Sequence, residues 1–84
     1  MDKSVFTPHY DLFKKRLVAM RVDAKLTQRQ LAEKLHRERS FVSRIELGER
    51  RLDVVEFYWV CRACGCDPEQ EAKDIMRQFA SHEK

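Results

Sequence analysis

Arginines are concentrated in one short stretch of this 84-residue chain. Five of its 17 basic residues fall within fifteen positions, at Arg37, Arg39, Arg44, Arg50 and Arg51. A guanidinium is permanently charged and presents a planar fork of N–H donors, which suits phosphate or the edge of guanine. The first 51 residues carry 13 Lys and Arg against 7 Asp and Glu, whereas the remainder carries 4 against 7. The basic part is where we expect a polyanion to bind.

Three cysteines form the second chemically distinctive group. Cys61 and Cys64 make a C-x-x-C motif and Cys66 adds a third thiol, which could indicate a zinc site or a redox pair. A structural zinc usually takes four ligands, and the three histidines are distant in the sequence. Cys61 and Cys64 also share an apolar helix face with Phe57. We therefore favour buried, reduced thiols and expect neither a metal nor a cofactor.

Composition predicts one small all-helical domain. Eighty-four residues allow a single core, and two Gly and two Pro leave little turn chemistry for hairpins. No histidine lies beside a plausible nucleophile and no glycine-rich phosphate loop exists, so we do not expect an enzyme. No apolar run approaches the roughly 20 residues that cross a bilayer, and the first ten residues lack a secretory signal. We expect a soluble, cytoplasmic protein with no membrane partner.

Apolar periodicity and capping residues predict five helices after a lead-in over 1–10, in which Val5 and Phe6 can fold back onto the domain. The helices are expected over about 11–23, from a cap at Thr27 to near His36, through Phe41 to about Leu47, from a cap at Asp53 to Gly65, and from a cap at Asp67 until the chain frays at Ser81. Capping-box pairs are Thr27 with Gln30, Asp53 with Glu56, and Asp67 with Gln70. The expected core includes Leu31, Leu35, Val42, Ile45, Phe57 and Val60.

The second and third predicted helices resemble a known family. The residues that carry the resemblance match the family pattern without a gap. They are Leu26-Thr27-Gln28, Leu31-Ala32 and Val42-Ser43-Arg44-Ile45-Glu46-Leu47-Gly48-Glu49-Arg50. They resemble the Cro and lambda-repressor-like, or xenobiotic-response-element, helix-turn-helix domains over residues 13–66. The resemblance implies a five-helix lambda-repressor-like fold whose third helix enters the major groove of DNA, while the second helix's start and the loop beyond the third meet phosphates.

The resemblance also implies roles for individual residues. The positions matched to base reading are Arg39, Ser40 and Arg44, with Glu38 as a candidate acceptor from cytosine. Those matched to phosphate contact are Gln28, Arg21, Ser43, Arg50 and Arg51. Arg21 is further expected to pair with Glu46. Two arginines among the readers predict a half-site with G·C pairs, each discriminating by about 1–3 kcal/mol. The alternatives are phosphate contact for Arg39 and Arg44, and solvated surface charge for Arg50.

Three residues depart from the family pattern in the turn. His36 stands where glycine is usual, Arg37 replaces an apolar residue, and Glu38 replaces Ser or Thr. We expect His36 to adopt a positive φ with some strain. Glu38 is a weaker cap, and its charge would repel a nearby phosphate.

A second apolar surface is predicted on the last two helices. Its candidate residues for a dimer interface are Val55, Trp59, Ile75, Met76 and Phe79. Either the fifth helix or the N-terminal lead-in covers Trp59 within the chain, or a second copy does. A homodimer would place two third helices about 34–36 Å apart and require an inverted-repeat operator.

The sequence therefore predicts a bacterial or phage-like transcriptional regulator that binds double-stranded DNA, with repression as the family's usual mode. The expected division is a lead-in over 1–10, a DNA-binding domain over 11–66, and a C-terminal helix and tail over 67–84 that could dimerise. The alternative is an interaction protein, such as an antitoxin, that covers a protein partner and autoregulates through DNA.

Overall fold

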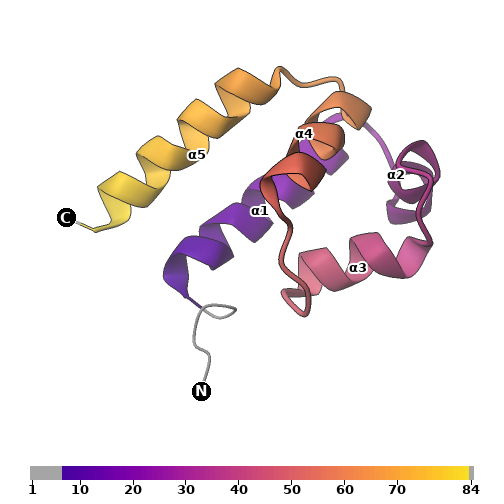
Figure 1. Ribbon diagram of the computed structural model, residues 1–84, viewed down its shortest axis with the longest axis horizontal. Coiled ribbons are helices and arrows are strands. Elements are labelled where there is room, and N and C mark those ends of the chain that lie inside the picture. The colour runs from indigo at the N-terminus through magenta and orange to yellow at the C-terminus, as the bar shows by residue number, and fades with distance from the viewer. Residues whose placement is uncertain (1–6, 84) are drawn as a thin grey trace.

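The computed structural model describes residues 7–83, which form five α-helices and no strand. The helices are α1 (Pro8–Asp23), α2 (Gln28–Lys34), α3 (Arg39–Leu47), α4 (Val54–Ala63) and α5 (Pro68–His82). The short helices α2 and α3 lie at one end, while the longer α1 and α5 run side by side at the other (Figure 1). The all-α class and the five-helix count agree with the sequence. None of the described helices has the length and apolarity that crossing a membrane requires.

The start of α1 differs from the expected one. The helix begins at Pro8, three residues before the predicted start at Asp11, because Thr7 caps it by accepting a hydrogen bond from the backbone N–H of Tyr10. Proline at the first helical position loses no intrahelical bond there. The suggestion that Val5 and Phe6 fold back lies outside the described residues.

Two of the three predicted capping boxes are present, at Thr27 with Gln30 and at Asp53 with Glu56. The third is wrong. Asp67 does cap α5, but the side-chain amide of Gln70 donates to Asp74 one turn later instead of reaching back to the cap. The C-terminal prediction is also wrong, because α5 continues to His82 rather than fraying from Ser81.

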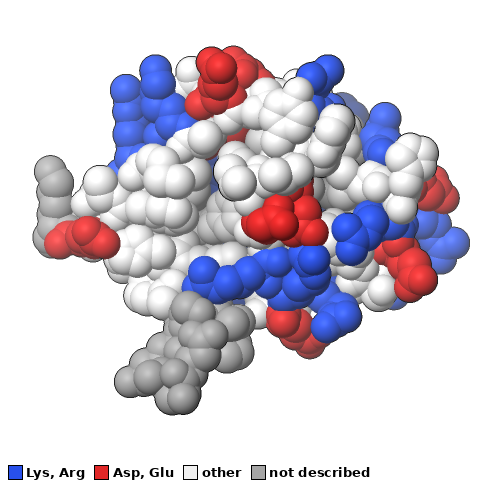
Figure 2. Space-filling model, viewed as in Figure 1, with Lys and Arg blue, Asp and Glu red and all other residues white. Residues whose placement is uncertain are grey.

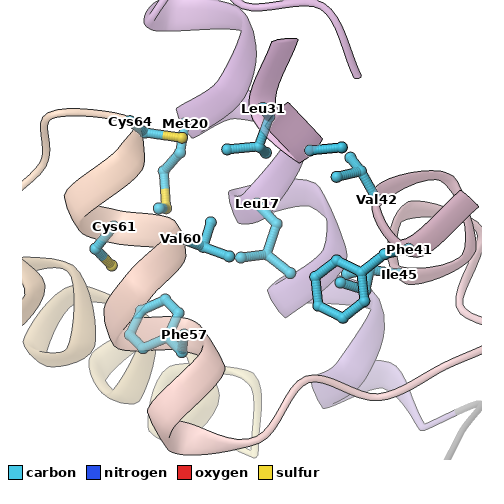
Figure 3. Packing of buried hydrophobic residues seen from close by; sticks show 11 residues of the cluster. Leu17, Met20, Leu31, Phe41, Val42, Ile45, Phe57, Val60, Cys61 and Cys64 are labelled. Atoms are coloured by element: carbon cyan, nitrogen blue, oxygen red, sulfur yellow. The ribbon is translucent and has the colours of Figure 1, made fainter. Parts of the chain in front are cut away.

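The core lies where α1, α2, α3 and α4 meet. Leu17 of α1 sits between Val60 of α4 and the α3 side chains Phe41 and Ile45 (Figure 3). Every residue expected in this core is buried except Leu35, which is half-buried against it.

Helix α5 packs on α1 through apolar contacts and ion pairs. Ile75 is only 2 % exposed. Arg16 of α1 forms a hydrogen-bonded ion pair with Glu71 at 2.8 Å and another with Asp74 at 2.9 Å. The sequence alone gave no sign of this pairing, because both partners lie more than fifty residues from Arg16. It fixes the C-terminal helix against the side of α1 and away from α3.

Candidate nucleic-acid interface

Helix α3 separates a buried face from an exposed one. Phe41, Val42 and Ile45 point into the core. The candidate base readers on the helix, Arg39, Ser40 and Arg44, are all exposed, as is Glu38 just before it. This division follows from the three- to four-residue spacing of the apolar side chains along α3. The four candidates thus lie together at one end of the molecule, and their contact with bases stays a prediction.

The turn before α3 is formed by an unusual residue. His36 has φ +57°, the left-handed conformation that the sequence reading expected of it. Glu38 occupies the N-cap position of α3 without making a side-chain cap hydrogen bond, so the first amides of the helix keep their free donors. Lys25, between α1 and α2, also has a positive φ of 62°, which the sequence reading missed.

A chain of hydrogen bonds ties Arg39 to α1. The Arg39 guanidinium donates to Gln28 Oε1 at 3.2 Å, and Gln28 Nε2 donates to Glu46 Oε1 at 2.9 Å. Glu46 in turn accepts from Arg21 Nε at 2.7 Å and from Arg21 Nη2 at 3.1 Å. The expected pair between Arg21 and Glu46 is therefore present, and Gln28 extends it to the first residue of α3.

The Arg21 guanidinium is used within the protein. Its third nitrogen donates to the backbone carbonyl of Leu26 at 2.9 Å, and its side chain is 15 % exposed against 9 % for that of Glu46. The hydrogen bonds to Glu46 raise the pKa of Arg21. Because all three guanidinium nitrogens of Arg21 already donate hydrogen bonds within the protein, few donors remain for a phosphate. The predicted phosphate contact of Arg21 is therefore less well supported, whereas its role in positioning α3 is unaffected.

Arg50 is held by a partner that the sequence reading assigned only to helix capping. Its guanidinium donates to both carboxylate oxygens of Glu56, at 3.0 and 2.8 Å. Glu56 comes from the first turn of α4, and these hydrogen bonds keep the pKa of its carboxyl below the usual value. Arg50 would therefore have to contact phosphate while its guanidinium is already in a bidentate ion pair with Glu56.

Arg37, the second departure from the family pattern, belongs to the same cluster. Its guanidinium carbon lies 3.9 Å from the centre of the Phe41 ring, and that of Arg50 lies 4.8 Å away. Arg37 Nη1 is also 3.8 Å from Glu56 Oε2. The helical i,i+4 rule gives no signal for this contact, because Arg37 lies in the turn before α3 and not in the helix.

The loop after α3 is fastened to α1 by Tyr10. The Tyr10 hydroxyl donates to the backbone carbonyl of Arg50 at 2.9 Å, and the Arg51 guanidinium lies 4.8 Å from the centre of the same ring. Burial raises the pKa of Tyr10. Arg51 itself is exposed. Sequence reasoning missed Tyr10, which lay in the presumed lead-in forty residues from its partner.

Ser43 is satisfied locally, since its hydroxyl donates to the backbone carbonyl of Ser40 at 3.2 Å. Its oxygen can still accept, but a hydroxyl whose proton is committed has no donor for a phosphate. The predicted phosphate contact of Ser43 is thus the least supported of that set, apart from the internally bonded Arg21.

Only some of the residues predicted for a dimer interface are exposed. Ile75 is buried in the chain and cannot contribute, and Phe79 is half-buried with its ring 5.4 Å from that of His9. The assignment of Ile75 is wrong because α5 turns that side chain into the protein, and the assignment of Phe79 stays a prediction. Val55, Trp59 and Met76 remain exposed, so α5 does not cover Trp59 as one intrachain alternative required.

The cysteines lie at the corner between α4 and α5, away from α3. Cys61 and Cys64 are buried free thiols in the core beside Met20 (Figure 3), and Cys66 is half-buried. Burial raises the pKa of Cys61 to about 12 and that of Cys64 to about 11. Among residues 7–83, no cluster of three or more metal-binding side chains occurs.

Comparison with known proteins gives the same picture. A family model described as a helix-turn-helix domain matches residues 15–73. An XRE-family like protein from Pseudomonas syringae pv. tomato str. DC3000 is 38% identical, with a TM-score of 0.82 over 90% of this chain and 93% of that one. Two crystal structures of the clp gene regulator ClgR from Corynebacterium glutamicum share the fold. One is 21% identical, with a TM-score of 0.72 over 86% of this chain and 94% of its own. The other is 22% identical, with a TM-score of 0.68 over 92% and 86%. A search of curated proteins found no match.

Proposed function

The chain belongs to the XRE-type, lambda-repressor-like helix-turn-helix family of DNA-binding regulators, and from this premise we propose that it binds a specific operator by inserting α3 into the major groove. The observation that carries the proposal is the two-faced structure of α3. Its apolar side chains are locked in the core while Arg39 and Arg44 extend from the opposite side. Fixed in this way, the helix can present the same side chains to every site that it meets.

Arg39 and Arg44 are the proposed readers of guanine. Arg44 forms no ion pair within residues 7–83, and Arg39 makes one hydrogen bond of 3.2 Å, to the neutral amide of Gln28. Both guanidiniums are therefore available for the bidentate contact with guanine O6 and N7. Ser40 and Glu38, on the same exposed side, are proposed to contact neighbouring base edges, Glu38 as an acceptor from cytosine.

Phosphate contacts are proposed for Arg51, for Arg50 and for Gln28 at the start of α2. Tyr10 holds the backbone between the two arginines, which supports a loop of fixed shape at the DNA backbone. These contacts would set the register of α3 without reading sequence.

We further infer that the protein acts as a repressor and as a homodimer on an inverted repeat. Repression follows from the family's usual mode, in which an occupied operator blocks polymerase. Of the predicted interface residues on α5, Met76 is the one that stays exposed, and it marks the side of that helix that is free for a second copy.

Selection of bound duplexes from a random library tests the proposal. The wild type should return an inverted repeat with G·C pairs in each half. Arg39→Ala and Arg44→Ala should each relax the preference at one position by about 1–3 kcal/mol. Arg77→Ala, an exposed arginine on α5, is the matched control and should return the wild-type motif. A half-site of A·T pairs alone would refute the assignment of the readers, and no motif at moderate salt would refute operator recognition.

The second candidate function is an interaction protein, such as an antitoxin, that binds a protein partner and autoregulates. It would draw support from a large apolar surface on α5, but α5 buries most of its apolar face. Most of the large exposed apolar side chains lie instead on α4, at Val54, Val55, Tyr58 and Trp59.

A further inference from the structure

Helix α4 leaves an apolar stripe exposed. Val55 is 61% exposed and Trp59 56%, and the half-buried Ala63 continues the same side of the helix after a further four residues. Eight residues of α-helix rise about 12 Å, so the stripe is as long as two helical turns. In Figure 2, residues other than Lys, Arg, Asp and Glu make up most of the surface over α4, with an acidic group and a row of basic residues beside them. No described part of the chain covers this side of Trp59.

A groove lies beside the stripe, between α4 and the turn that joins α2 to α3. Its volume is about 660 Å³. The apolar lining comes from Leu35, Phe41, Val60 and Ala63, with Trp59 at the edge. The groove therefore continues the exposed surface of Trp59 down to side chains of the core, which gives a bulky apolar group a place to be buried.

The rim of the groove is basic. Lys34, Arg37 and Arg62 line it together with Glu33 and Glu56. Of the two acids, Glu56 is already neutralised by its fork-to-fork pair with Arg50. Neither Lys34 nor Arg62 forms an ion pair with any residue that the structure describes, and Arg62 donates only to the Tyr58 hydroxyl.

We propose that this groove binds an acidic amphipathic segment of a partner protein. An apolar side chain of the segment would be buried beside Trp59, and its carboxylates would meet Lys34 and Arg62. This is the helix-in-groove mode of recognition, in which apolar anchors at helical spacing give affinity and the charged rim gives orientation. The proposal does not rest on operator binding, because the groove reaches the turn before α3 but none of the proposed readers Arg39, Ser40 and Arg44 lines it.

Two other occupants fit the groove less well. A DNA phosphate would satisfy the basic rim but would leave the apolar lining and Trp59 uncovered. A second copy packed through the same groove would bring its Lys34 and Arg62 against the Lys34 and Arg62 of the first, and these like charges repel. A partner segment with unpaired carboxylates next to apolar residues would complement both the basic rim and the apolar lining of the groove.

The test is selection from a library of random 16-residue peptides, carried out in parallel on the wild-type protein and on Trp59→Ala. Peptides enriched on the wild type should combine Asp or Glu with apolar residues three and four positions apart. Trp59 is the only tryptophan in the chain, so its fluorescence should shift to the blue as each peptide binds. Affinity should fall at least tenfold in Trp59→Ala and in Arg62→Glu. Val22→Ala, which removes another exposed apolar side chain on α1, should leave affinity unchanged.

Three results would overturn the proposal: no enriched peptides, enriched peptides without acidic residues, or peptides that bind Trp59→Ala as well as wild type. Sedimentation of both proteins separates the remaining occupants, since a wild-type dimer that Trp59→Ala dissociates would assign the groove to a second copy. A loss of operator affinity in Arg62→Glu with unchanged sedimentation would assign it to DNA. Operator selection on the same preparations keeps failure of this proposal distinct from failure of the DNA-binding function.

Discussion

Replacing Glu46 by alanine should be among the most destabilising changes on the polar surface of this protein. The Glu46 carboxylate accepts two hydrogen bonds from Arg21 and one from Gln28, and it joins α1, α2 and α3. Its side chain is 9 % exposed and that of Arg21 is 15 %. Glu46→Ala would therefore leave a largely desolvated guanidinium without its counter-charge.

The magnitude follows from the burial of the pair. An exposed ion pair contributes about 0.2–1 kcal/mol, whereas breaking a fully buried one costs about 3–5 kcal/mol. Because both side chains are close to the buried limit but still touch water, we expect Glu46→Ala to lower the free energy of unfolding by about 2–3 kcal/mol. For a domain of this size, that corresponds to a fall in Tm of roughly 10–20 °C.

Urea and thermal unfolding followed by circular dichroism would measure the loss. Lys15→Ala is the control, because Lys15 pairs with Asp11 at 3.3 Å but its side chain is 76% exposed, and we expect a loss below about 0.5 kcal/mol. If Glu46→Ala cost no more than Lys15→Ala, the bridge would be an ordinary surface pair. The inference that it holds α3 against α1 would then fail.

Arg51→Ala should weaken binding to all duplexes about equally and reduce the salt slope by about one, whereas Arg77→Ala should change neither; an unchanged slope would exclude a phosphate contact. His36→Gly should stabilise the protein by about 0.5–1 kcal/mol in urea unfolding, because glycine adopts φ +57° without strain, and a loss would show that the exposed imidazole makes a needed contact. With a thiol reagent at pH 8, the half-buried Cys66 should react first and Cys61 only on unfolding, since a pKa of about 12 leaves roughly one thiolate in ten thousand. Because the pKa of Cys61 is raised on folding, its stabilising effect should be complete below about pH 8 and be lost as the pH rises toward 12, so unfolding in urea should be easier at pH 10 than at pH 7.

The features that the sequence predicted well are those whose causes are local. A capping box needs two residues three positions apart, and both Thr27 with Gln30 and Asp53 with Glu56 behave as their spacing predicts. The N-terminal end of α1 failed for a local reason as well. Thr7 and Pro8 form a good helix start, but they precede the first apolar repeat, and periodicity alone placed the boundary later.

The features that the sequence could not predict depend on partners that only the fold brings together. Arg16 meets Glu71 and Asp74 across more than fifty residues, and no spacing rule reports such a pair. The same limit applies to Trp59. The sequence predicted that Trp59 belongs to a second apolar surface, but only the path of α5 decides whether that surface is covered.

The partners of the arginines show which of them are free to contact DNA bases, which their number alone does not. Five lie close together in the sequence, yet Glu56 holds Arg50 and lies near Arg37, and the ring of Tyr10 lies beneath Arg51. Of the five, Arg39 and Arg44 have no charged or aromatic partner among residues 7–83. A guanidinium that is already paired gives up favourable contacts when it turns to DNA, whereas an unpaired one gives up only water. The basic stretch therefore contains two kinds of arginine, and those free to discriminate between bases are the ones that α3 carries on its exposed face.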